Sequence, residues 1–233
     1  MFSQTLFRYF HSWCPNWARN ILSFLLITAI SMASIPDAHE IVPGIWLGNK
    51  RASENERWMK EKNITVVFNA TKDLPFSTSI KKQYRIPVDD NLQPEEIRNM
   101  TLWSHEAVYK LMMEHNKGQN VLVHCAAGMQ RSASIVGMYL IATKGMSWQQ
   151  AITYVQGIRP IAFRPSPNFK DSLINFDRSY HREILPQLGL GGDFVGTDMS
   201  LLGKLDQVVM DLGFPQYTTM TRISTLNMFV YTM

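Results

Sequence analysis

The residues best suited to chemistry in this chain are a cysteine and an arginine six positions apart. Cys125 ends the apolar run 121–125, and Arg131 begins a second apolar run, 131–143. The first run is typical of a buried strand, and the second is typical of a helix that ends at Gly145. The residues between the two runs are therefore expected to form a tight loop at the N-terminus of a helix.

A loop in that position can bind an anion, because its backbone N–H groups can point inward at the positive end of the helix dipole. Gly128 would provide the turn. In such a field a thiolate is favoured over a thiol, so the pKa of Cys125 should be depressed and its sulfur should be a nucleophile at neutral pH. The candidate anion-binding residues are Ala126, Ala127, Gly128, Met129, Gln130 and Arg131.

The flanking residues suit the transfer of a phosphoryl group. The planar fork of Arg131 can bind two phosphoryl oxygens, and the Ser132 hydroxyl can donate to the cysteine sulfur as it leaves a phosphocysteine. His124 is expected to orient the loop. Each residue alone has an ordinary structural explanation, but the joint spacing should occur by chance at about 1 in 10⁵ per cysteine.

The segment 124–132 matches the pattern H-C-x-x-G-x-x-R-S/T and so resembles the cysteine-dependent protein tyrosine phosphatase superfamily. It is most similar to the dual-specificity phosphatases, including small viral members. The resemblance implies hydrolysis of phosphotyrosine, phosphoserine and phosphothreonine through a phosphocysteine, with no metal and no cofactor. It covers about 40–184, with further matching pieces at 45–49, 67–71, 86–90 and 166–169.

A phosphatase of this kind needs a general acid for the leaving oxygen. Asp89 and Asp90 are the candidates, and the family places the acid at the second position after I-P-x, which implies Asp90. Asn168 resembles a family asparagine that braces the phosphate loop, although it can equally be a residue of a first helical turn. Arg159 and Arg164 precede it, and either could contact a second phosphate or an acidic substrate residue.

Apolar and β-branched content predicts strands at 45–47, 64–69, 84–88 and 121–125. Periodicity and cap residues predict helices at 94–115, 131–143, 148–156 and 166–182. The third helix has a capping box, Ser147 with Gln150, and the fourth has Ser166 as its cap. Strands that alternate with helices indicate an α/β domain. We expect a mainly parallel sheet of about four to five strands, flanked by helices, with the phosphate loop between a strand and a helix.

The chain of 233 residues is expected to form a catalytic domain at 39–185 between an N-terminal helical extension, 1–38, and a tail, 186–233. The segment 21–35 is apolar but shorter than the ~20 residues of a membrane span. A secretion signal, a membrane anchor and a helix that packs on the domain or across a homodimer are all open; small viral members can dimerise through an N-terminal helix. The tail has a Gly-rich linker and an amphipathic stretch, 201–212.

The charge and the cysteine content limit which binding partners and which cellular compartment are expected. The net charge is +4 with no long basic run, so a strong nucleic-acid signature is missing. The two cysteines are Cys14 and Cys125, and the second must stay reduced, which indicates a reducing, cytoplasmic compartment. A redox-controlled bridge between them is the alternative. No cluster of metal ligands is visible in the sequence.

Phosphorylated proteins are the expected substrates, because the variable loop positions carry no charge. Phosphoinositide phosphatases of the superfamily tend to have lysines there, to meet a polyanionic headgroup. An RNA 5′-phosphatase and a phosphoinositide phosphatase are the alternatives within the superfamily. A non-catalytic phosphopeptide-binding protein is a third, but such proteins usually lack the cysteine, the arginine or the acid, and all three are present here.

Overall fold

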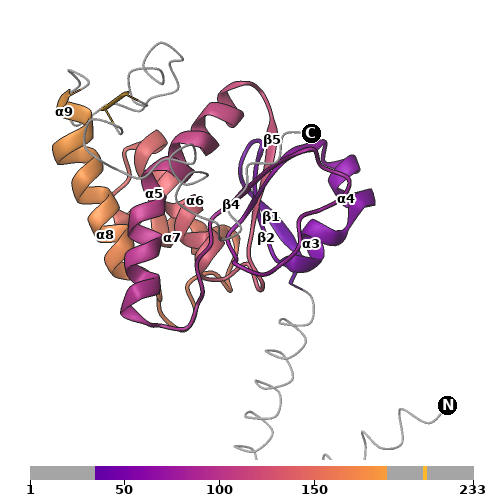
Figure 1. Cartoon of the computed structure of the whole chain (residues 1–233), viewed down its shortest axis with the longest axis horizontal. Helices are drawn as coiled ribbons and strands as arrows, with labels where there is room; N and C mark the ends of the chain where they lie inside the picture. Colours follow the sequence, from indigo (N-terminus) through magenta and orange to yellow (C-terminus); the bar gives the residue numbers. More distant parts are fainter. Residues whose placement is uncertain (1–34, 188–206, 209–233) are drawn as a thin grey trace, which may run out of the picture. The chain divides into compact units, whose positions relative to one another are not determined.

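A central five-stranded sheet organises the part of the chain that the computed structural model describes, residues 35–187 and 207–208 (Figure 1). The strand order is β1-β2-β5-β3-β4, with β1 antiparallel to β2 and the other pairs parallel. The α/β architecture expected from the sequence is confirmed. The strands are β1 (Ala38–Val42), β2 (Ile45–Gly48), β3 (Ile64–Asn69), β4 (Lys82–Arg85) and β5 (Asn120–His124).

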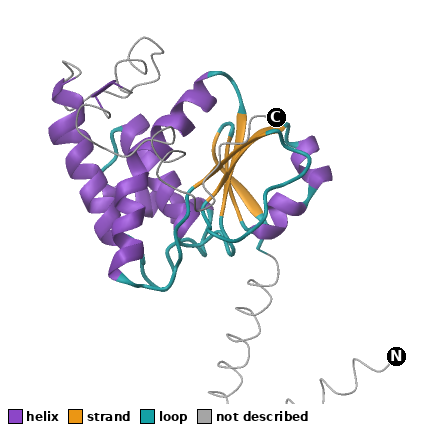
Figure 2. Cartoon of the chain, viewed as in Figure 1, coloured by secondary structure: helices purple, strands orange, loops and turns teal. Residues whose placement is uncertain are grey.

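Helices cover both faces of the sheet, as Figure 2 shows. Two short helices lie on one face, and the longer helices lie on the other. The short helices are α3 (Lys50–Glu54) and α4 (Glu56–Glu61). The other face carries α5 (Pro94–Asn116), α6 (Arg131–Lys144), α7 (Trp148–Ile158), α8 (Lys170–Ser179), the π-helical turn η1 (Tyr180–Ile184) and α9 (Leu185–Gln187).

Local sequence signals set several helix ends. Pro94 is in the first turn of α5, where its missing N–H costs nothing. Ser147 and Gln150 form the predicted capping box of α7. Gly145 ends α6 in the left-handed conformation with φ of 62°. These three predictions are confirmed, so the boundaries of the helices behind the loop follow from short-range chemistry.

Two predicted elements had wrong boundaries. The strand predicted at 84–88 runs instead from Lys82 to Arg85. It stops there because Pro87 has no N–H for a ladder and Val88 donates back to the Ile86 carbonyl at 2.9 Å. The helix predicted from Ser166 begins only at Lys170. The strand β1 and the helices α3 and α4 were not predicted; the two helices begin after short asparagine caps.

Two apolar clusters hold these layers together. The larger lies between the sheet and α5 to α8, and it includes Cys125 and, from the far C-terminal stretch, Val208. The smaller lies beneath α3 and α4 and is formed by Ala52, Met59, Ile64, Val67 and Leu122. The strand β5 contributes to both, because its side chains alternate between the two faces. The strand that ends at the loop is therefore held by packing on both faces of the sheet.

Several expectations fall on residues outside the described ranges. They concern the apolar segment 21–35 apart from its last residue, the residue Cys14, the Gly-rich linker and nearly all of 201–212. Within residues 35–187 and 207–208, no helix has both the length and the apolar character that crossing a membrane requires.

Candidate active site

The loop 125–130 connects β5 to the first residue of α6, at the carboxyl end of the parallel strands. Its turn requires glycine. Gly128 has φ of +65°, and a Cβ there would lie 2.5 Å from the carbonyl oxygen of Gly48 at the end of β2. The loop thus packs backbone to backbone against the neighbouring strand.

The carbonyl groups of five successive loop residues all accept hydrogen bonds from surrounding elements. In a planar trans peptide the N–H points opposite to the carbonyl, so the N–H groups of residues 127–131 face the other, inner side of the loop. An anion-binding concavity follows from this arrangement. The bonds are Lys50 N to Ala126 O at 3.1 Å, Arg159 Nη2 to Ala127 O at 3.3 Å, Arg159 Nε to Gly128 O at 2.8 Å, Phe163 N to Met129 O at 2.8 Å and Ser134 N to Gln130 O at 2.8 Å.

The thiol of Cys125 lies at the base of this concavity and is 2% exposed. The Ser132 hydroxyl donates to the sulfur at 3.2 Å. Burial raises the pKa of Cys125, but donation from the Ser132 hydroxyl and backbone, the charge of Arg131 and the Met129 N–H outweigh it, so the pKa is lowered. The environment therefore favours the thiolate more strongly than water does around a free cysteine.

Arg131 begins α6 and links the loop to residues 88–90, which contain the two candidate acids and are called the acidic segment below. Its Nη1 donates to the carbonyl of Val88 at 3.1 Å. Its Nε is buried and, among the residues that the structure describes, has no hydrogen-bond partner. A buried cationic donor without an acceptor is costly, and an oxyanion bound in the loop would supply one.

The two candidate acids have different environments. The Asp89 carboxylate pairs with Lys72 at 3.2 Å. Asp90 is exposed, and its Oδ1 accepts from the side chain of Asn168 at 2.7 Å. Among the described hydrogen bonds, Asn168 is joined to the loop through its backbone, whose N–H donates to the Gln130 side chain at 3.0 Å. Of the two aspartates, Asp90 is the one without a cationic partner among the described ion pairs.

The side chain of Gln130 is directed away from the concavity. It is buried, and its Nε2 donates at 2.9 Å to the carbonyls of Arg164 and Ser166. These bonds, with the one to the Asn168 N–H, hold 166–168 against the loop and explain why the predicted helix does not begin at Ser166. Only the backbone of Gln130 is available to an anion.

Arg159 is a structural cation, which sequence reasoning did not identify. It is 0% exposed, so the suggested contact with a second phosphate is wrong for this residue. Besides its bonds to two loop carbonyls, its Nη1 lies 2.9 Å from His39 Nδ1 in β1. An arginine at a helix end next to proline is normally exposed, so no local signal distinguishes it. Arg164 is exposed, as expected of a loop arginine.

His124, the last residue of β5, is 1% exposed. Burial lowers its pKa to about 4, helped by the charges of Arg85 and Arg131 and opposed by a bond to the Cys125 backbone. The ring is therefore neutral at pH 7. A neutral buried imidazole is suited to supporting the loop.

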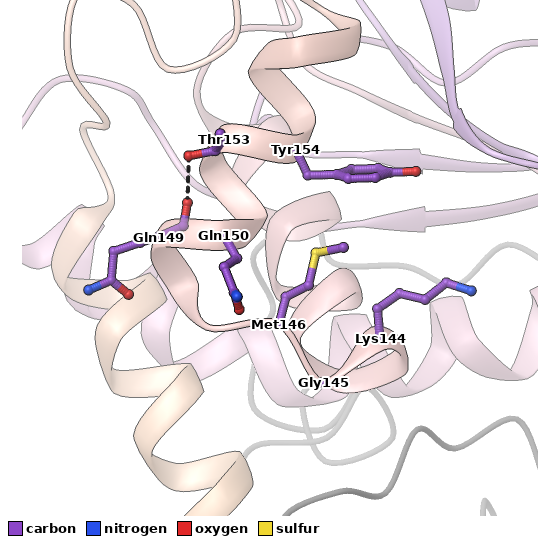
Figure 3. A pocket seen from close by; sticks show the side chains of 7 residues that line it. All are labelled: Lys144, Gly145, Met146, Gln149, Gln150, Thr153 and Tyr154. Carbon is purple, nitrogen blue, oxygen red and sulfur yellow. Dashed lines mark hydrogen bonds between the residues drawn. The ribbon is translucent and has the colours of Figure 1, made fainter.

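A separate cavity of about 570 Å³ lies at the turn between α6 and α7. Figure 3 shows that it presents glutamine, threonine and tyrosine side chains, with the Thr153 hydroxyl bonded back to its own helix. None of its lining residues belongs to the loop, and none is an acid or a thiol. They are Lys144, Gly145, Met146, Gln149, Gln150, Thr153 and Tyr154.

Solved structures similar to this chain have phosphatase folds. A mouse putative dual specificity phosphatase complexed with zinc tungstate aligns with a TM-score of 0.55 and 24% identity, covering 64% of this chain and 91% of that one. The human DUSP28 structure aligns with a TM-score of 0.54 and 24% identity, over 62% and 95% of the two chains.

Curated relatives are similar over the same region. Dual specificity protein phosphatase 8 of Mus musculus is 30% identical over 165 residues, which are 70% of this chain and 24% of the relative. Dual specificity protein phosphatase 16 of Homo sapiens is 32% identical over 178 residues, or 73% and 25% of the two chains. The chain thus spans about a quarter of the length of these relatives. The family "Dual specificity phosphatase, catalytic domain" matches residues 45–179. This chain therefore belongs to the family of dual specificity phosphatase catalytic domains.

Proposed function

We propose that this chain is a dual-specificity protein phosphatase that hydrolyses phosphotyrosine and phosphoserine or phosphothreonine through a phosphocysteine intermediate. The observation that carries the proposal is the buried Cys125 thiol with a lowered pKa, set in a loop whose N–H groups turn inward beside the unpartnered Nε of Arg131. Family membership and the named relatives support the same activity.

In the first step the Cys125 sulfur attacks phosphorus, the bond from phosphorus to the substrate oxygen breaks, and Asp90 donates a proton to that oxygen. The loop N–H groups and the Arg131 guanidinium hold the three equatorial oxygens. Asp90 is proposed as the acid because the Asp89 carboxylate forms an ion pair with Lys72. Asp90 itself is exposed and its carboxylate is held in place by an amide.

In the second step water attacks the phosphocysteine while Asp90 accepts its proton. The bond between phosphorus and sulfur breaks, which releases inorganic phosphate and the thiolate. The Ser132 hydroxyl, 3.2 Å from the sulfur, stabilises the negative charge that returns to it. None of these steps needs a redox partner.

The substrate class follows from the rim of the loop. Ala126 and Ala127 are exposed and uncharged, so these two loop positions offer no cation to a polyanionic lipid headgroup. We propose phosphorylated proteins as the partners and a reducing compartment as the location, because oxidation of Cys125 would remove the nucleophile.

The test compares wild type with Cys125→Ser on phosphotyrosine, phosphoserine and phosphothreonine peptides, an inositol phospholipid and 5′-triphosphorylated RNA. We expect phosphate release from the peptides by wild type, and loss of turnover with retained peptide binding in Cys125→Ser. Cys14→Ser is the matched control and should keep full activity. Full activity in Cys125→Ser, or phosphate release from the lipid or the RNA alone, would refute the proposal.

A further inference from the structure

A buried carboxylate holds the backbone immediately before Asp90. Glu96 lies in the first turn of α5, and its side chain is only 7% exposed. Its Oε2 accepts the backbone N–H of Asp89 at 2.8 Å, and its Oε1 accepts from the Lys72 ammonium. Lys72 follows β3 and also pairs with the Asp89 carboxylate at 3.2 Å. Glu96 and Lys72 together therefore clamp Asp89 at both its backbone and its side chain.

With the clamp, three consecutive residues of the acidic segment are each held by hydrogen bonds or ion pairs from other elements. The Val88 carbonyl is held by Arg131, Asp89 is held by the clamp, and the Asp90 side chain is held by Asn168. Arg131 also belongs to the anion-binding loop, and Asn168 is bonded directly to the candidate acid. Among the described hydrogen bonds and ion pairs, Glu96 is joined to neither the loop nor Asp90, so the clamp reaches Asp90 through Asp89.

The geometry points to Glu96 and Lys72 as positioning residues for the general acid. The bond to the Asp89 N–H fixes the peptide between Val88 and Asp89, and the pair with Lys72 fixes the Asp89 side chain. The residue directly before Asp90 is thus held on two sides, which limits the directions in which the Asp90 side chain can leave the backbone. Pairing of Lys72 with the other aspartate keeps the adjacent carboxylate away from the leaving oxygen. The inference rests on the proposed function, because it presupposes that Asp90 is the acid.

The charges agree with this arrangement. Burial raises the pKa of Glu96, but bonds from Lys72 and from the Asp89 N–H outweigh it, and the net pKa is lowered. The bond to Glu96 raises the pKa of Lys72 against its partial burial. Glu96 is thus an anion and Lys72 a cation throughout the neutral range, and the clamp does not loosen with pH there.

The test uses the dependence of kcat/KM on the leaving group. This ratio reports the steps up to departure of the substrate oxygen, and a general acid accelerates them only for a poor leaving group. Difluoromethylumbelliferyl phosphate has a good leaving group, and a phosphothreonine peptide has a poor one. Asp90→Asn calibrates the assay. We expect it to lose about 100-fold on the peptide and much less on the aryl phosphate.

Glu96→Ala should lose about tenfold in kcat/KM on the peptide and little on the aryl phosphate, as expected when one charge-assisted bond is removed. Lys72→Met should shift the same ratio in the same direction, and Lys72→Arg should restore it. Glu61→Ala, which breaks the exposed pair of Arg57 with Glu61, is the control and should leave the ratio unchanged. Melting temperatures identify any variant that fails to fold, and Glu96→Gln then replaces Glu96→Ala.

A loss that is equal on both substrates in the Glu96 and Lys72 variants would show a merely structural role and overturn the inference. No loss on either substrate would overturn it as well. If Asp90→Asn itself fails to distinguish the two substrates, the assignment of the acid in the proposed function is wrong and the inference falls with it. If Asp90→Asn distinguishes them and the clamp variants do not, only the inference fails.

Discussion

Replacement of Arg159 by methionine tests whether the loop geometry is imposed from outside the loop. Methionine retains much of the length of the side chain but donates no hydrogen bonds. The carbonyls of Ala127 and Gly128 would lose donors now at 3.3 and 2.8 Å, from a side chain that is 0% exposed. A hydrogen bond to a charged group contributes about 1.5–3 kcal/mol, so losing two should cost about 3–6 kcal/mol. For a chain of this size, that lowers the melting temperature by about 6–24 °C.

The same variant should weaken the nucleophile. Burial lowers the pKa of Arg159, and the charge of the Cys125 thiolate acts in the opposite direction. Without the guanidinium, the thiolate loses a nearby positive charge, so the pKa of Cys125 should rise. The rate of alkylation by iodoacetamide, followed against pH, measures this change directly. Its midpoint, and the acidic limb of kcat/KM, should both move to higher pH.

Arg164→Met is the matched control, because this arginine is on the same connection and is exposed. Its melting temperature and alkylation midpoint should equal those of wild type. Arg159→Lys keeps a charge but lacks the fork, so it should fall between wild type and Arg159→Met in stability. A melting temperature and an alkylation midpoint in Arg159→Met that both equal the wild-type values would refute the reasoning.

Two further predictions concern backbone strain and acid stability. Gly128→Ala should abolish aryl phosphatase activity and lower the free energy of unfolding by at least ~2 kcal/mol, because φ is +65° and its Cβ would meet Gly48 O at 2.5 Å. Gly118→Ala, with φ of +75° and open space around it, should cost only about 1 kcal/mol in urea unfolding and keep activity. Burial lowers the pKa of His105 to about 3, so the unfolded chain takes up the proton first and stability is lost as pH falls from 6.5 toward 3. Urea unfolding should show about 2 kcal/mol lost to this group by pH 5 and a shallower slope in His105→Asn; identical slopes would contradict the assignment.

The loop was predictable because its signals are contiguous. A strand, a tight turn with Gly128 and a helix that ends at Gly145 lie within about 25 residues, and each signal is short-range. The Ser132 donation to the Cys125 sulfur also follows from spacing on the first turn of that helix. The strand, turn and helix signals of this segment all indicate the same local structure, so it could be predicted from the sequence.

The residues that support the loop were not predictable in this way. Arg159 is 31 residues from the Gly128 carbonyl that it holds, and Lys72 is 24 residues from Glu96. Their roles depend on which segments the sheet brings together. Ser166 shows the opposite case, in which a good local cap signal is overridden because the Gln130 side chain binds the Ser166 carbonyl.

The choice between Asp89 and Asp90 shows why partners outside a motif matter. Local sequence rules do not distinguish two adjacent carboxylates. In the structure, however, Lys72 forms an ion pair with Asp89 and the Asn168 side chain donates a hydrogen bond to Asp90. Asn168 is in turn held through its N–H by Gln130, which belongs to the anion-binding loop. A continuous series of bonds thus runs from that loop through Asn168 to Asp90. A displacement of the loop is therefore transmitted to the carboxylate, so the distance between the proposed nucleophile and the proposed acid depends on residues that neither motif contains.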